Sequence, residues 1–376
     1  MSWVTVTLGD VCELYQPKTI STKEMVDDGE YVVFGANGVI GRYDQYNHEE
    51  PQLLITCRGA TCGAVNISTP KAWINGNAMV VRPKGNDIDR RFLEYLFRGG
   101  VDLSKTITGA AQPQITRQTL APLEIRYPTS LPEQQRIVGK LDAAFAALTE
   151  AQAHVERNRA NARELFESYL NGVFEGKGDG WVEKRLGDLI DIQNGYAFSS
   201  REYQDEGHFL IRISNVQDGE IVLANPKYVA INDARLERFN LNEGDILVSL
   251  TGNIGRVGIM QAEHLPAALN QRVARITLKD EKTIRHNFLF FFLRSNFFRE
   301  HLQAAGHGAA QQNVSTKEIA EVELSVPPLK EQQRVLDALR ELQIKSDELE
   351  TTYQQKLSEL AGLKKAVLGA AFRGEL

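Results

Sequence analysis

The chain has 376 residues, 42% hydrophobic and 24% charged, which is too apolar for a disordered protein and sufficient for two or three hydrophobic cores. Its net charge of -6 at pH 7 and its pI near 5.8 exclude a protein that holds nucleic acid by bulk positive charge, because such affinity comes from Lys and Arg neutralising phosphates. Three cysteines are too few for a disulfide framework, no apolar run is long enough to cross a membrane, and the first residues lack a signal-peptide pattern, so we expect a folded, soluble, cytoplasmic protein without a membrane partner.

The chain is a tandem repeat, because short motifs return in the same order in its second half. The first copy of each motif is Trp3-Val4 with Leu8-Gly9-Asp10, Phe92-Leu93, Gly109-Ala110-Ala111-Gln112, Glu133-Gln134-Gln135-Arg136 and Phe174-Glu175-Gly176. The second copy is Trp181-Val182 with Leu186-Gly187-Asp188, Phe288-Leu289, Gly308-Ala309-Ala310-Gln311, Glu331-Gln332-Gln333-Arg334 and Phe372-Arg373-Gly374. The shift between copies grows up to the Glu-Gln-Gln-Arg motif and is constant after it, which predicts a variable module followed by a segment of fixed length in each half.

The first module, residues 1–130, carries short β-rich runs that are separated by Gly and Asn turns. These runs are Tyr31–Phe34, Gln52–Thr56 and Ala78–Val81, followed by a helix near Asp89–Phe97 and a strand at Leu123–Tyr127. The second module, residues 177–328, has the runs Phe209–Ile213, Asp245–Ser249 and Val273–Ile276, a helix near Ile284–Leu302 and a strand at Val322–Val326. Mixed strands and helices of this kind predict two α+β domains.

The segments 131–176 and 329–376 carry apolar residues at steps of four and three, which is typical of a coiled coil. The predicted helix–helix seam consists of Ile137, Leu141, Leu148, Val155, Leu165, Tyr169, Val335, Leu339, Leu342, Leu349, Tyr353, Leu360, Leu363 and Val367. A helix of about 43 residues is on the order of 65 Å long. These segments therefore predict two long helical spacers.

Either packing direction of the two helices is sterically possible, and a pseudo-two-fold repeat favours the antiparallel one. Ala144 and Ala151 correspond to Leu342 and Leu349, and small residues opposite large ones suit a seam between unlike helices. Asn158 and Lys356 occupy equivalent seam positions; they either fix the register or lie where the seam is open to water. The predicted fold is α+β: two β-rich mixed domains in a pseudo-two-fold tandem repeat, separated by two long helices that form an antiparallel coiled coil.

Motifs for catalysis or metal binding are missing from the sequence. We find no glycine-rich cofactor loop after a strand, no Walker loop, no His-Glu-x-x-His pair and no Cys-x-x-Cys site. Asn225-Pro226-Lys227-Tyr228 approaches the quartet that DNA methyltransferases use for a flipped base, but it lacks the second proline. We therefore expect no catalytic residue, no bound cofactor and no metal in this chain.

Two glycine-rich loops are the main candidate sites. Arg58–Gly63 and Thr251–Arg256 each follow a predicted strand, at comparable places in the two modules. Closely spaced glycines expose backbone amides and permit close approach to a phosphate, and the adjacent Arg58 or Arg256 adds positive charge. Alternatively, each loop is a tight hairpin that needs glycine only for positive φ.

Polar loop side chains supply further candidates, because Arg suits guanine edges and Asn or Gln suits adenine edges. One cluster combines Asn75 and Asn77 with Asn270, Gln271 and Arg272, and another combines Gln112 and Gln114 with Gln311, Gln312 and Asn313. The remaining DNA-binding candidates are Asn37, Arg42, Thr61, Tyr196, Arg212, Asn215, Thr251 and Asn253.

The arrangement of these motifs resembles the specificity subunit of type I restriction–modification enzymes. Two unlike modules open with Trp3 and Leu8-Gly9-Asp10 or Trp181 and Leu186-Gly187-Asp188, and long helices follow the motif Pro328-Leu329-Lys330-Glu331-Gln332-Gln333-Arg334 and end in Ala371-Phe372-Arg373-Gly374. The first half departs slightly, with Ser130-Leu131-Pro132-Glu133 and Val173-Phe174-Glu175-Gly176. The resemblance covers essentially the whole chain.

The resemblance implies a non-catalytic subunit in which each module is a target recognition domain for one half of a bipartite, asymmetric site in double-stranded DNA. It implies domains at 1–130 and 177–328, with conserved helical spacers at 131–176 and 329–376 that set the gap between the half-sites. Two modification subunits, which carry S-adenosylmethionine and methylate adenine, would dock on the helices, and a restriction subunit with motor and nuclease activity can join them.

The charges of the modules favour a partner that completes the DNA clamp. Residues 1–130 hold 13 basic and 14 acidic side chains, and residues 177–328 hold 17 and 20. The alternative from another class is a coiled-coil scaffold whose globular modules bind protein. A stand-alone modification enzyme is a second alternative, which the missing cofactor loop disfavours.

Overall fold

The computed structural model describes residues 2–109, 112–176, 178–230, 232, 234–305 and 313–376, which fall into two compact units. One unit comprises residues 1–157 and 354–376, and the other comprises residues 158–353. Each unit therefore combines one module with parts of both long helices. In the part of the chain that the structure describes, no helix has the length and apolar character needed to cross a membrane.

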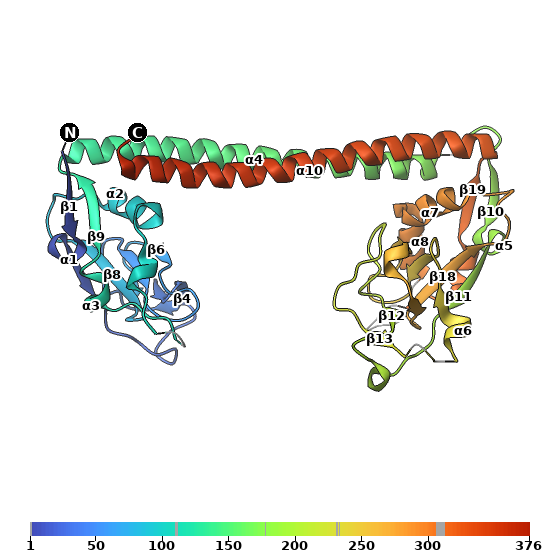
Figure 1. The fold of residues 1–376 in the computed structure, drawn as a ribbon, viewed down its shortest axis with the longest axis horizontal. Helices are drawn as coiled ribbons and strands as arrows, with labels where there is room; N and C mark the ends of the chain where they lie inside the picture. Colours follow the sequence, from blue (N-terminus) through green and yellow to red (C-terminus); the bar gives the residue numbers. More distant parts are fainter. Residues whose placement is uncertain (1, 110–111, 177, 231, 233, 306–312) are drawn as a thin grey trace. The chain divides into compact units, whose positions relative to one another are not determined.

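The module of the first unit is built on two small sheets and a strand pair (Figure 1). One sheet has the antiparallel order β2-β8-β5-β6, the other has the order β4-β3-β7, and β1 pairs with β9. The strands are β1 (Trp3–Thr7), β2 (Cys12–Tyr15), β3 (Tyr31–Gly35), β4 (Gly38–Tyr43), β5 (Leu53–Thr56), β6 (Val65–Ile67), β7 (Trp73–Ile74), β8 (Ala78–Pro83) and β9 (Glu124–Pro128). The helices are α1 (Leu8–Val11), α2 (Arg90–Tyr95), which continues as the π turn η1 (Leu96–Gly100), η2 (Leu103–Thr106) and α3 (Arg117–Leu120).

The module of the second unit repeats this topology, except that its third sheet has the order β13-β12-β17-β14 and so contains the additional strand β14. The sheet β11-β18-β15-β16 corresponds to β2-β8-β5-β6, β10 pairs with β19, and the parallel pair β12-β17 corresponds to β3-β7. The strands are β10 (Val182–Arg185), β11 (Ile190–Asn194), β12 (His208–Ile211), β13 (Tyr228–Val229), β14 (Asn240–Leu241), β15 (Ile246–Ser249), β16 (Val257–Ile259), β17 (Ala267–Leu269), β18 (Val273–Leu278) and β19 (Glu323–Val326). The helices are α5 (Leu186–Leu189), η3 (Ser200–Glu202), α6 (Leu236–Phe239), η4 (Ala262–His264), α7 (His286–Arg294), α8 (Asn296–Ala305) and α9 (Thr316–Glu321).

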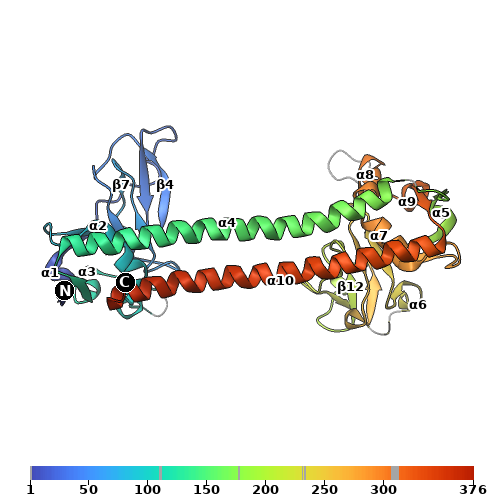
Figure 2. The same cartoon turned by 90° about the horizontal axis from the view of Figure 1, so that it is seen from above.

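The two long helices are antiparallel in each unit, which confirms the predicted fold. α4 (Leu131–Glu175) and α10 (Leu329–Arg373) have 45 residues each. In the first unit the start of α4 lies beside the end of α10 (Figure 2), and the Arg136 guanidinium donates to the Leu376 carbonyl at 2.7 Å. In the second unit the end of α4 lies beside the start of α10, and the Ser346 hydroxyl donates to the Ala162 carbonyl at 3.0 Å.

The buried stripe of each helix differs from the predicted seam. Ile137, Leu141, Leu148, Val335 and Leu339 are buried, whereas Val155, Leu342, Tyr353, Leu360 and Val367 are half-buried. Leu165, Tyr169, Leu349 and Leu363 are 42–59% exposed and do not belong to the seam, so the prediction was wrong there. The buried residues near the helix ends are instead Ala162, Phe166, Leu170 and Phe174 in α4, and Leu368 and Phe372 in α10. Their spacing of four residues reflects packing against a module as well as against the other helix, which a heptad pattern does not include.

The end of each long helix completes the core of a module: α10 that of the first module, which is distant in sequence, and α4 that of the second module, which follows it directly. Phe372 packs edge-on against Phe92 at 5.5 Å between ring centroids, and Phe174 packs against Phe288 at 5.3 Å. Trp3 lies 6.4 Å from Phe92, as Trp181 does from Phe288. The recurring Trp and Phe residues are therefore equivalent parts of two aromatic clusters, one in each unit.

The recurring Glu-Gln-Gln-Arg motif fastens the start of each long helix to its module. The Gln134 side chain is fully buried; its oxygen accepts from the Asp89 amide at 2.7 Å, and its nitrogen donates to the carbonyls of Asp87 and Pro128 at 2.9 Å. Gln332 makes the equivalent three bonds with Arg285, Thr283 and Pro327. Because a buried side-chain amide needs hydrogen-bond partners, this glutamine fixes where the helix begins relative to the module.

Candidate nucleic-acid interface

Three predicted loops of the first module meet at the end of strand β5. The Cys57 amide donates to the Asn77 carbonyl at 3.1 Å, and the Cys57 carbonyl accepts from the Ile115 amide at 2.9 Å. The next residue, Arg58, forms a β-bridge with Gln114. The glycine loop, the Asn75–Asn77 turn and the Gln112–Gln114 segment are therefore neighbours.

The second module makes the same connections at the end of strand β15. The Leu250 amide donates to the Arg272 carbonyl at 3.0 Å, and the Leu250 carbonyl accepts from the Val314 amide at 2.9 Å. Thr251 forms a β-bridge with Asn313. The clusters that sequence reasoning placed in each module thus converge at one equivalent place in both.

These hydrogen bonds also define which loop residues are equivalent. The Thr56 amide donates to the Ala64 carbonyl, as the Ser249 amide does to the Arg256 carbonyl. Arg58 therefore corresponds to Thr251, and Arg256 corresponds to Ala64. Arg58 thus lies at the start of its loop, whereas Arg256 lies at the end of its loop. The glycines are needed for backbone conformation: φ is +88° at Gly59 and +73° at Gly252, and a Cβ at Gly59 would meet no atom within 4 Å.

Several candidate side chains project from these loops and make no hydrogen bond or ion pair with other described residues. All are exposed. In the first module they are Arg58, Thr61, Asn77, Gln112 and Gln114, and in the second they are Asn253, Gln271 and Arg272. Exposed donors and acceptors on neighbouring loops are suited to hydrogen bonding with a polar ligand such as a nucleic acid.

Other candidate side chains are buried inside the modules. The Asn75 amide group bonds both backbone groups of Ile20, and the Asn215 side chain is fully buried and donates to the carbonyls of Val222 and Ala224. Thr251 and Asn270 are also buried. The prediction that these four side chains are free to contact bases was wrong. Asn75, Asn215 and Asn270 bond nearby backbone groups, as short polar side chains beside a strand end commonly do. The buried Thr251 hydroxyl has no hydrogen-bond partner among the described residues.

A further group of candidate side chains makes hydrogen bonds or ring contacts within the protein. Arg42 donates to the carbonyls of Gly29 and Glu30, and the side chains of Asn37 and Asn66 bond each other. The Arg256 guanidinium donates to the Gln217 side chain at 2.8 Å. Tyr196 is 37% exposed and carries the Arg235 guanidinium 4.6 Å from its ring centroid. Gln311 and Gln312 lie outside the described residues.

A cleft of about 300 Å³ opens beside this place in the second module. Its lining includes the candidates Arg212, Asn270, Gln271 and Arg272. Arg212 donates to the Asn225 carbonyl at 2.6 Å, while its buried Nε has no partner among the described residues. Tyr203 and Ser214 also line the cleft. Ser214 was missed as a candidate, although its position just after the strand ending at Ile211 was a usable signal.

The cysteines add no reactive group to the interface. Burial raises the pKa of the Cys57 thiol to about 11 and that of Cys12 to about 12, so both thiols are protonated at neutral pH. Among the described residues no cluster of three His, Cys, Asp or Glu side chains could hold a metal ion.

Comparison with known proteins identifies the class to which this fold and this paired interface belong. The family model for the type I restriction modification DNA specificity domain matches residues 1–156 and again residues 178–359. The chain therefore belongs to this family, and both halves match it.

Its relatives include named specificity subunits of comparable length. The chain is 23% identical to the type I restriction enzyme MjaVIII specificity subunit of Methanocaldococcus jannaschii, over all of this chain and 93% of that protein. It is 22% identical to the EcoBI specificity subunit of Escherichia coli, over 87% of this chain and 74% of that protein. The HsdS subunit from Thermoanaerobacter tengcongensis shares the fold, with a TM-score of 0.60 at 21% identity over all of this chain and 97% of that chain. A chain from a solved structure on complex assembly and conformational transition of the type I R-M system has a TM-score of 0.76 at 18% identity, over all of this chain and 98% of that one.

Proposed function

We propose that this chain is the non-catalytic DNA-recognition subunit of a type I restriction–modification complex. Each module contacts one half of a bipartite site in double-stranded DNA, and the paired helices set the gap between the halves and dock two modification subunits. A restriction subunit is a further partner of the complex. The recognition domains correspond to residues 1–130 and 177–328, and the spacers to residues 131–176 and 329–376.

One observation carries the recognition part of this proposal. Exposed polar side chains gather at the end of β5 and again at the end of β15, on loops held together by equivalent backbone hydrogen bonds. The framework is the same in both modules, whereas the side chains on it differ, as between Asn77 and Arg272. A common frame with unlike side chains is what reading two different half-sites requires.

The docking part rests on exposed apolar residues of the helices. Leu165 and Leu363 are 59% and 50% exposed and occupy equivalent positions, since the constant shift of 198 residues relates them. On α4 the exposed Tyr169 lies one turn from Leu165, and neighbouring exposed apolar side chains on one helix face suit contact with a partner protein. The repetition of Leu165 as Leu363 suits two copies of one partner. The modules carry no excess of basic residues, so we expect the modification subunits to supply much of the grip on DNA phosphates.

The recognition proposal is tested by methylome sequencing of cells that carry single variants. We expect Arg58→Ala to relax the base requirement in one half of the methylated motif, and Arg272→Ala to relax the other half, because each removes a side chain worth about 1–3 kcal/mol of base discrimination. Arg126→Ala is the control, since this exposed arginine on β9 stacks on Trp3 outside the three loops. A motif that stays unchanged in both variants contradicts the proposal.

The same variants test the alternative that the modules bind protein. If the chain is a scaffold, sequence-specific DNA binding of the assembled complex is insensitive to Arg58→Ala and Arg272→Ala. The proposal also predicts that the chain alone binds its site weakly and that added modification subunit raises this affinity steeply. A mobility-shift titration with equal affinity in both conditions would count against it.

A further inference from the structure

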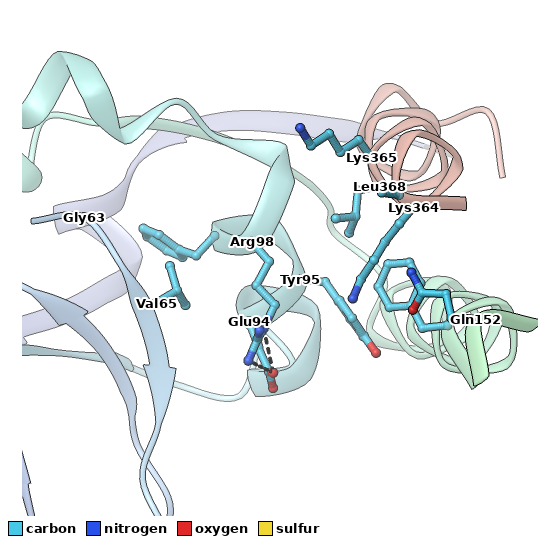
Figure 3. A pocket seen from close by; sticks show the side chains of 12 residues that line it. Gly63, Val65, Glu94, Tyr95, Arg98, Gln152, Lys364, Lys365 and Leu368 are labelled. Atoms are coloured by element: carbon cyan, nitrogen blue, oxygen red, sulfur yellow. Dashed lines mark hydrogen bonds and ion pairs between the residues drawn. The ribbon is translucent and has the colours of Figure 1, made fainter. Parts of the chain in front are cut away.

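The first unit contains a groove of about 710 Å³ between its module and the two long helices (Figure 3). α10 contributes one helical face, since Ala361, Lys364, Lys365 and Leu368 are spaced by three and four residues. Phe145 of α4 and Tyr95 of α2 contribute aromatic rings that lie 5.4 Å apart. The groove is thus apolar along its floor and large enough for a bulky side chain.

The rim of this groove carries positive charge without a local counter-charge. Lys364 lies over the Phe145 ring, with its ammonium 5.3 Å from the ring centroid, and Figure 3 shows Lys365 on the same helix. Neither lysine has a carboxylate within ion-pair distance among the described residues. Arg98, in contrast, is paired with Glu94 at 3.0 Å. A carboxylate brought to the rim would therefore meet two unpaired ammonium groups.

The equivalent place in the second unit is filled. The shift of 198 residues between the long helices places Phe166 where the first unit has Lys364. The shift of 196 residues that relates Phe92 to Phe288 places Phe290 where the first unit has Glu94, and Arg294 where it has Arg98. The Arg294 guanidinium lies 5.4 Å from the Phe166 ring and 5.6 Å from the Phe290 ring, with only 10% of its side chain exposed. The second unit has thus replaced the open cationic groove by an enclosed arginine between aromatic rings.

We propose that the groove of the first unit is a docking site for an acidic amphipathic helix of the modification subunit, and that the second unit has no such site. The inference rests on the proposed function. An apolar side chain of this helix enters between Phe145, Tyr95 and Leu368, and its carboxylates pair with Lys364 and Lys365. This is the helix-in-groove mode of recognition, with charge complementarity at the rim.

Two consequences follow from the position of the groove. It is also lined by Gly63, the last residue of the Arg58–Gly63 loop, and by Val65, the first residue of β6. A bound helix therefore rests against the base of that loop and couples docking to DNA contact in the first module. The two modification subunits also bind in unequal steps, because only one finds the groove.

The test is a titration of this chain with the modification subunit of its own system, followed by native mass spectrometry and calorimetry. The double variant Lys364→Phe with Glu94→Phe copies the second unit and fills the groove. We expect it to weaken one of the two binding steps by about tenfold or more and to leave the other within about twofold. The variant Lys364→Glu with Lys365→Glu keeps the groove open and should weaken the same step, mainly at low salt. Lys140→Glu, on the exposed face of α4, is the control and should change neither step.

The outcomes separate this inference from the function on which it rests. Two equal binding steps, unaffected by either double variant, overturn the groove proposal and leave the proposed function standing. Equal weakening of both steps overturns it as well. If the unaltered chain binds no modification subunit, both proposals fail. The charge-reversal variant keeps the test decisive if the aromatic variant does not fold.

Discussion

At the scale of single residues, one buried amide in each half joins helix to module. Gln134→Leu removes three hydrogen bonds to the backbone of Asp87, Asp89 and Pro128, of which the one to Pro128 is buried and the other two are partly buried. We expect a loss of about 3 kcal/mol of stability in the first unit, because an unsatisfied buried polar group costs about 1–3 kcal/mol. Urea unfolding of the variant measures this loss.

The neighbouring glutamine provides the control for this prediction. Gln135 is exposed, so Gln135→Leu should change the unfolding midpoint little. Gln332→Leu should destabilise the second unit by a similar amount, since Gln332 makes the same three bonds. Equal stabilities of the Gln134 and Gln135 variants would show that the buried amide has no special role.

The candidate interface could be predicted from the sequence only as a set of loops. Glycine pairs, polar amides and their recurrence located the right segments, because turn chemistry is local. Which side chains are available to a ligand was not predictable. The Asn75 side chain hydrogen-bonds the backbone of Ile20, which lies 55 positions earlier, whereas Asn77 is exposed. This difference depends on tertiary packing, which the residue types do not encode.

At the scale of secondary-structure elements, the end of α10 belongs to the first module and the end of α4 to the second. Phe372→Ala should destabilise the first unit by about 3 kcal/mol, because it empties an aromatic site beside Phe92 in the core. Phe174→Ala should act on the second unit instead, through Phe288. Hydrogen exchange localises each effect: amides of β5 and β8 should exchange faster in the first variant, and amides of β15 and β18 in the second.

The crossed pattern is the informative part of this experiment. Each variant serves as the control for the other, since both remove one ring from the end of a 45-residue helix. Faster exchange of β15 and β18 amides in Phe372→Ala, with β5 and β8 unchanged, would contradict the assignment of helix ends to modules.

The pairing of α4 with α10 should also depend on pH through Glu350. Hydrogen bonds from the guanidinium groups of Arg163 and Arg159 hold the pKa of Glu350 below its ordinary value of 4.5. Its contribution, about 1 kcal/mol for a partly exposed pair, is complete above that ordinary value and is lost as pH falls through the lowered pKa in the folded protein.

We therefore expect the second unit to lose stability in acid and Glu350→Gln to lose less of it over the same interval. Thermal unfolding between pH 6 and about pH 3 measures the difference between the two proteins. Because other carboxylates titrate in this range, only this difference is diagnostic. Parallel curves for the two proteins would rule out a role for Glu350.

The helices themselves were predictable, whereas their buried faces were only partly so. Apolar periodicity and the flanking prolines indicated both long helices. The heptad failed toward their C-terminal ends, where Phe166 and Leu170 are buried in place of Leu165 and Tyr169. A helix that packs on a sheet domain and on another helix buries a wider face, and a single-partner pattern cannot assign it.

At the scale of the whole molecule, the repeat suits the two half-site readers that we propose. Each unit reuses one topology, one aromatic cluster and one buried glutamine, so the framework is duplicated while the loops are free to diverge. The long helices of the two repeats have the same length, 45 residues each. A fixed length is expected of a spacer, since it determines which gap between half-sites the proposed complex accepts.

The spacer role predicts the effect of removing one heptad from both helices. Residues 149–155 of α4 and 354–360 of α10 are matched segments, because in the first unit Phe145 faces Lys364 and the helices are antiparallel. The deletion shortens each helix by about 10 Å, or roughly three base pairs of DNA, and keeps the supercoil phase nearly unchanged. Methylome sequencing should then find the same half-site bases with a gap about three base pairs shorter, recognised less tightly because the half-sites are also rotated about the duplex. An unchanged gap would mean that the helices do not set the spacing.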